Sequence, residues 1–169
     1  MHPTAEELAA LGVELEALLG GRRVVVMGVG NELRGDDGIG VLLAERLEQC
    51  VDCPVFVTFD LPEDYAVKAA DLRPDVLLVL DAADFGGEPG QVRLIRALEI
   101  PPTAGVTHRP SLQMLARFLE LDAGAQTWVL GVQPDITRVG LGAQMCAPVL
   151  RAADALEELL TELLDAAEN

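Results

Sequence analysis

The sequence is poor in basic residues and in long apolar runs, and both scarcities exclude classes of protein. It has 169 residues, with 12 Lys and Arg against 28 Asp and Glu, and a formal net charge of −16. This charge argues against nucleic acid and anionic membranes as partners, because both are bound through clustered basic side chains. No apolar run approaches the roughly 18 residues that span a bilayer, and residues 1–7 lack the features of a signal peptide. We therefore expect a soluble, cytoplasmic protein.

Cysteine is also scarce, with only Cys50, Cys53 and Cys146. An odd number of cysteines without a secretory signal argues against a disulfide framework. Cys50 and Cys53 have the C-x-x-C spacing, but they lie between a predicted helix and a predicted strand, whereas redox motifs open a helix. A second C-x-x-C, which a zinc site would need, is missing from the sequence. We interpret the pair as thiols in a connection.

The residues that are abundant form apolar strands alternating with amphipathic helices. Strands are predicted at 23–28, 54–59, 76–82, 90–97 and 125–132, and helices at 4–19, 38–49, 63–71, 110–120 and 144–167. This alternation predicts an α/β three-layer sandwich, in which a mostly parallel twisted sheet of about five strands carries helices on both faces. Residues 1–169 then form a single domain, in which an N-terminal helical extension (1–21) precedes the α/β domain (22–169).

A glycine-rich turn, GVGNELRGDDGIG at 28–40, follows the first of these strands. It does not fit a phosphate cradle, because Leu33 stands where the dinucleotide fingerprint needs glycine and the P-loop lysine is absent. Two acidic side chains, Asp36 and Asp37, occupy the turn instead. One of them suffices to cap the helix that begins near Gly38, which leaves the other to face the crevice.

Two further polar side chains fall at the same predicted edge of the sheet. In open parallel sheets, sites form beyond the carboxyl ends of the strands. Asp81 ends the most apolar strand, where a carboxylate needs a partner, and His108 lies in the loop before the helix at 110–120. Two carboxylates and an imidazole suit a divalent ion such as Ni, Zn, Mn or Fe, with open coordination positions. Ser111, the one serine, is a weaker candidate nucleophile because no G-x-S-x-G elbow surrounds it.

Four segments, in this order, resemble the hydrogenase maturation endopeptidases. The turn at 28–40 is similar to the family's G-x-G-N-x-L-x-x-D-D-G-x-G signature, and LVLDAADFGGEPG (78–90) resembles its second block. THRPSL (107–112) resembles the histidine block, and LGVQPD (130–135) is typical of formate-hydrogenlyase-type members. The resemblance runs from about residue 23 to the closing helix. One departure lies at 58–64, where TFDLPED replaces the D-G-G-[ST] of many members but keeps a likeness to their P-E-N variant.

This resemblance implies a nickel-dependent endopeptidase. Its substrate would be a nickel-loaded precursor of a nickel–iron hydrogenase large subunit, from which it removes a C-terminal extension. The family's metal-contacting residues correspond to Asp37, Asp81 and His108, which we predict to be both catalytic and metal-binding. The nickel would come with the precursor, although another divalent metal is allowed in the isolated protein. A monomer is expected.

Two other classes of function are compatible with the residues alone. The first is a non-catalytic α/β module that binds nickel or a cofactor during metallocentre assembly, which tight nickel binding without proteolysis would indicate. The second is a nucleotide-binding regulator, which retained adenine nucleotide would indicate. Four matching segments in order favour the endopeptidase.

Overall fold

The computed structural model describes residues 3–102, 105–106 and 108–167. In these residues the strands are β1 Val24–Val29, β2 Val55–Phe59, β3 Val76–Asp84, β4 Val92–Arg96, β5 Gly105–Val106 and β6 Gln126–Val132. The α-helices are α1 Ala5–Leu19, α2 Ile39–Leu47, α3 Ala66–Asp71, α4 Arg109–Ala123 and α5 Ala147–Ala167. Short 3-10 helices are η1 Glu32–Gly38, η2 Pro62–Tyr65, η3 Ala97–Glu99 and η4 Ile136–Arg138.

The sheet has the strand order β2-β1-β3-β6-β4. The pairs β1–β2, β1–β3 and β3–β6 are parallel, whereas β4 runs antiparallel to β6 at the edge. The two-residue strand β5 pairs antiparallel with the end of β3. The predicted mostly parallel α/β sheet is therefore confirmed, and β5 is an addition that was not predicted.

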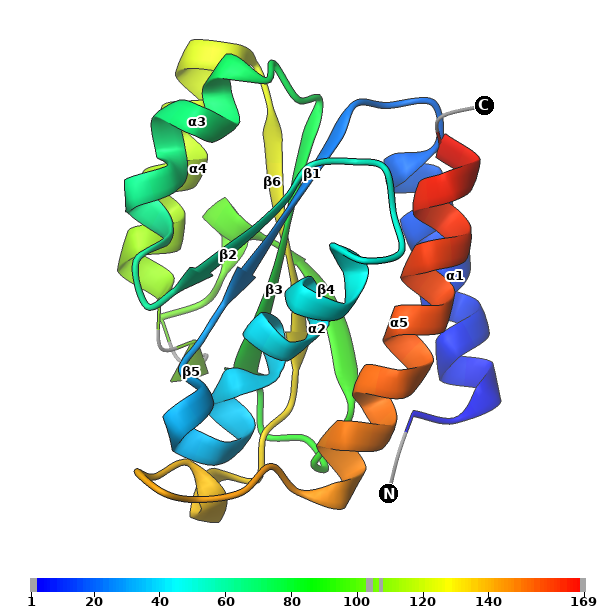
Figure 1. The fold of residues 1–169 in the computed structure, drawn as a ribbon, viewed down its shortest axis with the longest axis vertical. Coiled ribbons are helices and arrows are strands. Elements are labelled where there is room, and N and C mark those ends of the chain that lie inside the picture. Colours follow the sequence, from blue (N-terminus) through cyan, green and yellow to red (C-terminus); the bar gives the residue numbers. More distant parts are fainter. Residues whose placement is uncertain (1–2, 103–104, 107, 168–169) are drawn as a thin grey trace.

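Helices cover both faces of the sheet, as predicted. Figure 1 shows α3 and α4 on one side and α1, α2 and α5 on the other. Two buried clusters match this division, one under α1, α2 and α5 and one under α3 and α4. The central strand β3 supplies both, because alternate residues point to opposite faces; Leu78 and Leu80 join the first cluster, and Leu77 and Val79 join the second.

The N-terminal helix α1 begins with a capping box. The Thr4 hydroxyl accepts a hydrogen bond from the Glu7 amide at 3.1 Å, and the Glu7 carboxylate accepts one from the Thr4 amide at 2.7 Å. Although this helix was expected as an extension of the α/β domain, Leu15 and Leu19 are fully buried in the first cluster. The helix therefore contributes to the main core.

Two predicted helices have different limits in the structure. The segment predicted as a helix at 63–71 is divided into η2 and α3, and Tyr65 at the junction has φ −99° and ψ 0°. The closing helix, predicted from residue 144, begins at Ala147. Pro148 explains this start, because a residue without an amide hydrogen fits the first turn of a helix.

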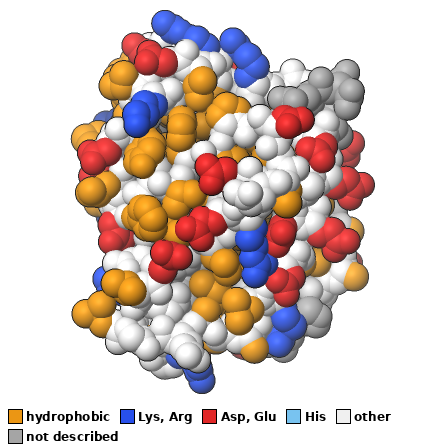
Figure 2. Space-filling view, viewed as in Figure 1, with side chains coloured by type: hydrophobic (Ala, Val, Ile, Leu, Met, Phe, Trp, Pro, Cys, Tyr) orange, Lys and Arg blue, Asp and Glu red, His pale blue; other side chains and the backbone are white. Residues whose placement is uncertain are grey.

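The surface reflects the acidic composition. Figure 2 shows acidic side chains scattered over the viewed face, with fewer basic ones among them. In the part of the chain that the structure describes, none of the helices combines the length and the apolar character needed to cross a membrane.

Candidate active site

Loops from three neighbouring strands and the start of α4 meet at one edge of the sheet. Because β1, β2 and β3 are parallel, their carboxyl ends lie at the same edge. Asp37 lies in η1 after β1, Asp60 follows β2 directly, Asp81 lies in β3, and His108 precedes α4. Asp37, Asp81 and His108 therefore lie at the edge of the sheet where the sequence analysis expected them.

The η1 turn has a kink at Arg34 and Gly35, directly before its two aspartates. Gly35 has φ +62°, a left-handed conformation that favours glycine. Asp36 is fully buried, and its carboxylate accepts hydrogen bonds from the Asp135 amide at 2.8 Å and the Cys146 amide at 2.7 Å. The Cys146 thiol donates a third, at 3.1 Å. Asp36 thus fastens the turn to the segment between β6 and α5.

The predicted helix cap is wrong, since Gly38 takes the N-cap position of α2. Asp36 has a structural role, but it does not cap the helix. Its contacts join η1 to a segment about a hundred residues further along the chain. Asp37 is nearly buried, with a relative exposure of 2%. Its charge reaches the other predicted site residues, because it raises the pKa of both Asp81 and His108.

Asp81 and His108 form a buried pair. His108 Nδ1 lies 3.4 Å from Asp81 Oδ2, and Asp81 Oδ1 accepts a hydrogen bond of 2.8 Å from the Ala82 amide. Asp81 is fully buried. Burial raises the pKa of Asp81 to about 6, although the hydrogen bond and charge of His108 oppose this shift. A carboxyl group with such a raised pKa can gain or lose its proton not far below neutral pH.

The second ring nitrogen of His108 faces a carboxylate that the sequence analysis did not select. His108 Nε2 lies 3.1 Å from Asp60 Oδ1. Burial alone would lower the pKa of His108, but the hydrogen bond and charge of Asp81, together with Asp60 and Asp37, raise it to about 9. At neutral pH the ring is therefore an imidazolium between two carboxylates. Asp60 directly follows β2 at the same edge of the sheet, so the same rule could have pointed to this residue, although not to its contact with His108. Asp81 does not end its strand as predicted, because β3 continues to Asp84.

A hollow of about 180 Å³ opens beside Asp37. Its lining also includes Ala82, Asp84, Gly105, Pro134, Ile136 and Val139. Gln133 holds Asp84, one of these lining residues, in place. Its amide nitrogen donates to Asp84 Oδ1 at 3.0 Å, and its amide oxygen accepts from the Phe85 amide at 2.9 Å. Larger hollows lie elsewhere: one of about 420 Å³ is lined by Arg22, Cys53 and Pro74, away from the site residues.

The arrangement provides proton-transfer groups and negative charge. Among residues 3–102, 105–106 and 108–167, no group of three His, Cys, Asp or Glu side chains is arranged to hold a metal ion. Asp81 and His108 are in contact, and Asp37 acts on both through its charge. The metal-binding role of the three residues stays a prediction. In the described residues, Cys50 is exposed, Cys53 is partly exposed and Cys146 is buried.

The fold and the site together define an α/β protein with a buried Asp–His pair at the carboxyl edge of a mostly parallel sheet. The family model described as "Hydrogenase maturation protease" matches residues 61–163. The hydrogenase 3 maturation protease of Escherichia coli K12 is 37% identical over 142 residues, which cover 80% of this chain and 87% of that protein. This chain belongs to the hydrogenase maturation protease family, and it is a hydrolase.

Solved structures of the same kind share the fold. A [NiFe] hydrogenase maturation protease, HycI from Thermococcus kodakarensis KOD1, superimposes with a TM-score of 0.80 at 33% identity, covering 89% of this chain and 98% of that one. The hydrogenase maturating endopeptidase HybD from E. coli gives a TM-score of 0.61 at 27% identity, covering 83% and 91%. The resemblance that four sequence segments indicated is thus confirmed at the level of family and fold.

Proposed function

We propose that this protein is an endopeptidase that removes the C-terminal extension of a nickel–iron hydrogenase large-subunit precursor. We propose further that it recognises the nickel which the precursor carries. The single observation that supports this best is the buried Asp81–His108 pair, with the charge of Asp37 acting on it at the same sheet edge. Its cytoplasmic location and monomeric state stay predictions.

The negative charge of the site supports the proposal that nickel arrives as part of the substrate. Three carboxylates, Asp37, Asp60 and Asp81, surround a single imidazolium, so an arriving cation meets net negative charge. A nearby divalent ion favours loss of a proton from a ligand. Nickel in the precursor would therefore displace the proton of His108 and leave Asp37, Asp81 and the ring nitrogen as contacts for the metal.

Two routes to cleavage of the peptide bond are open. The bound nickel could polarise the scissile carbonyl or activate a water molecule. Alternatively, His108 or a carboxylate could accept the proton of the attacking water, as a general base. In both routes the bond is correctly placed only when nickel is present, so the metal acts as a checkpoint for completed assembly.

The test is a comparison of nickel-loaded and nickel-free precursor. Each is incubated with the protein, and the mass of the large subunit is measured. We expect loss of the C-terminal extension only from the loaded precursor. Equal cleavage of both would contradict nickel recognition while leaving the peptidase activity intact, and cleavage of neither would overturn the peptidase proposal.

A further inference from the structure

Asp60 is a half-exposed carboxylate whose two oxygens contact different side chains. Oδ1 lies 3.1 Å from His108 Nε2, and Oδ2 accepts a hydrogen bond of 3.0 Å from Asn31 Nδ2. Because Asp81 holds the other ring nitrogen, the imidazole is held at both ends. A carboxylate can serve two donors at once, whereas an amide side chain has only one acceptor oxygen.

Asn31 connects this contact to the turn that carries Asp37. Its backbone amide donates to the carbonyl of Asp37 at 3.2 Å, and its side-chain oxygen accepts from the Leu33 amide at 3.0 Å. The same side chain then reaches Asp60 through its nitrogen. A continuous series of contacts therefore runs from the Asp37 turn through Asn31 and Asp60 to the ring of His108.

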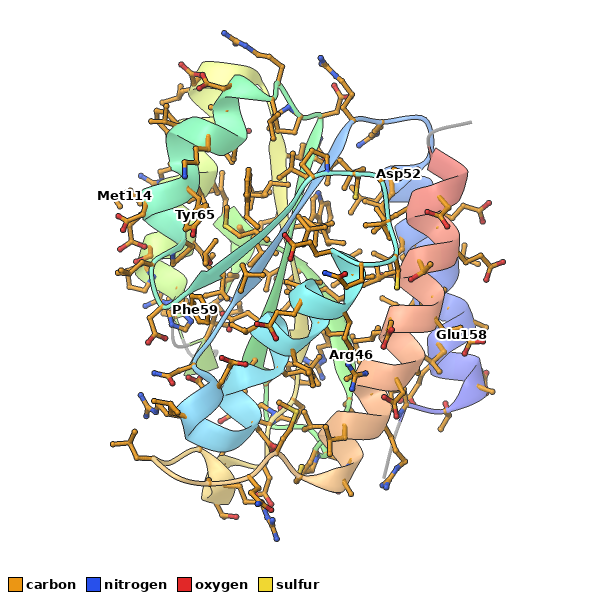
Figure 3. The ribbon with its side chains drawn as sticks, viewed as in Figure 1. Arg46, Asp52, Phe59, Tyr65, Met114 and Glu158 are labelled. Atoms are coloured by element: carbon orange, nitrogen blue, oxygen red, sulfur yellow. The ribbon has the colours of Figure 1, made fainter. Side chains whose placement is uncertain are left out.

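The backbone before Asp60 is held in an unusual conformation. Phe59, labelled at the end of β2 in Figure 3, has φ +52°, which is rare for a bulky residue. The pairing of β1 with β2 shifts register here, so that Val29 pairs with Phe59 and Gly28 with Val57. The Gly30 amide secures the bend by donating to the Phe59 carbonyl at 3.0 Å. Irregular pairing of this kind redirects side chains near active sites.

We propose that Asp60 is a positioning residue, which fixes the ring of His108 in one orientation before the precursor arrives. It acts through His108, because Asp60 holds Nε2 while Nδ1 faces Asp81. When the substrate takes Nδ1 together with Asp81, Asp60 keeps its contacts with Nε2 and with Asn31. This inference rests on the proposed function, in which His108 contacts the substrate.

The first test is a kinetic comparison of Asp60→Ala and Asp60→Asn. Loss of a side chain that orients a functional histidine reduces activity by about 10- to 100-fold. We expect this loss in kcat, with little change in KM, for Asp60→Ala. Asp60→Asn keeps one acceptor oxygen, so its kcat should lie between the kcat of Asp60→Ala and that of the unchanged protein. Asp64→Ala removes a charge from an exposed position in the same segment and should keep the full kcat.

The second test measures the ring directly. The chain has only two histidines, so His2→Gln leaves His108 as the sole source of imidazole signals in a nitrogen-15 NMR spectrum. We expect the Nε2–H signal to be protected from exchange with water. Asp60→Ala should remove this protection, and Asp64→Ala should not. If Asn31 acts on His108 through Asp60, then Asn31→Ser should cause no further loss of kcat in a protein that already carries Asp60→Ala.

The outcomes separate this inference from the proposed function. A wild-type kcat and an unchanged ring signal for Asp60→Ala would overturn the positioning role, even if the protein cleaves its precursor. If no precursor is cleaved but the ring signal of Asp60→Ala changes as expected, the endopeptidase proposal fails and the orienting contact is supported.

Discussion

Adjacent aspartates in the η1 turn have different environments, and this difference predicts different consequences of the same substitution. Asp36 accepts hydrogen bonds from the amides of Asp135 and Cys146, so Asp36→Asn would place an amide NH₂ against a backbone N–H. A buried donor left without an acceptor costs about 1–3 kcal/mol. We expect Asp36→Asn to lower the free energy of unfolding, measured by chemical denaturation, while the folded fraction still cleaves precursor.

Asp37→Asn is the matched substitution at the neighbouring position. Here we expect loss of precursor processing, because the negative charge that acts on Asp81 and His108 is removed. Cleavage is measured as the mass change of the large subunit. The reverse pattern, with an inactive Asp36→Asn protein and an active Asp37→Asn protein, would show that their roles are exchanged.

The Asp81–His108 pair also predicts a pH dependence of stability. The folded-state pKa of His108 is raised from 6.5 to about 9, so the stability that it contributes is complete below 6.5 and is lost as the pH rises through about 9. The pKa of Asp81 is raised from 3.8 to about 6. The stability that Asp81 contributes therefore also increases as the pH falls, here from about 6 towards 3.8. The charged groups that face the ring are carboxylates: Asp37, Asp60 and Asp81.

The variant His108→Gln isolates the part of this dependence that belongs to the ring. We expect the difference in unfolding free energy between the unchanged protein and His108→Gln to shrink from about pH 7 to about pH 10, as the imidazolium loses its proton. Chemical denaturation at each pH measures it. A difference that stays constant over this range would mean that the ring is not charged in the folded protein.

At the scale of elements, the close approach of α2 to the sheet brings η1 to the site. A Cβ atom on Gly40 would overlap the backbone carbonyl oxygens of Leu80 and Val29, which belong to β3 and β1. Asp81 is the next residue along β3, so the packing of this helix determines how near Asp37 comes to it. Arg46 fastens the other end of α2 to α5 by ion pairs with Asp154 at 2.9 Å and Glu157 at 3.0 Å.

Gly40→Ala tests this packing. Overpacking of a well-filled interior costs about 1–3 kcal/mol and sometimes more, and the atoms in the way here are backbone atoms. We expect a lower melting temperature and a weaker precursor cleavage, because α2 must move away from β3. Gly140→Ala is the control, since a Cβ there meets no atom within 4 Å. Equal melting temperatures for the two variants would contradict the role of this contact.

The sequence predicted the elements that have a clear period or a long apolar run. The apolar run at 76–82 predicted the central strand, and the amphipathic segment at 4–19 predicted a helix of nearly the observed length. The two-residue strand β5 was missed because two residues cannot show a period. The contact between Asp60 and His108 was missed because it depends on a shifted register and a left-handed Phe59. Such features arise from packing between segments and leave no local pattern.

At the scale of the whole molecule, the packing of α1 determines whether this helix unfolds together with the α/β domain. Leu15 is fully buried in the cluster that also holds residues of β1, β3 and α5. If the chain is a single domain, Leu15→Ala should lower the free energy of unfolding by about 2–5 kcal/mol, as for other buried leucines. Denaturation monitored by circular dichroism and by Trp128 fluorescence should show one coincident transition for both signals.

Val13→Ala is the matched control in the same helix. Val13 has a relative exposure of 67%, and substitutions at such surface positions change stability by no more than about 0.5 kcal/mol. A Leu15→Ala protein in which the circular dichroism signal of a helix is lost first, while Trp128 on β6 keeps its native fluorescence, would show that α1 unfolds independently. In that case the helix is an extension, and the domain begins at the first strand.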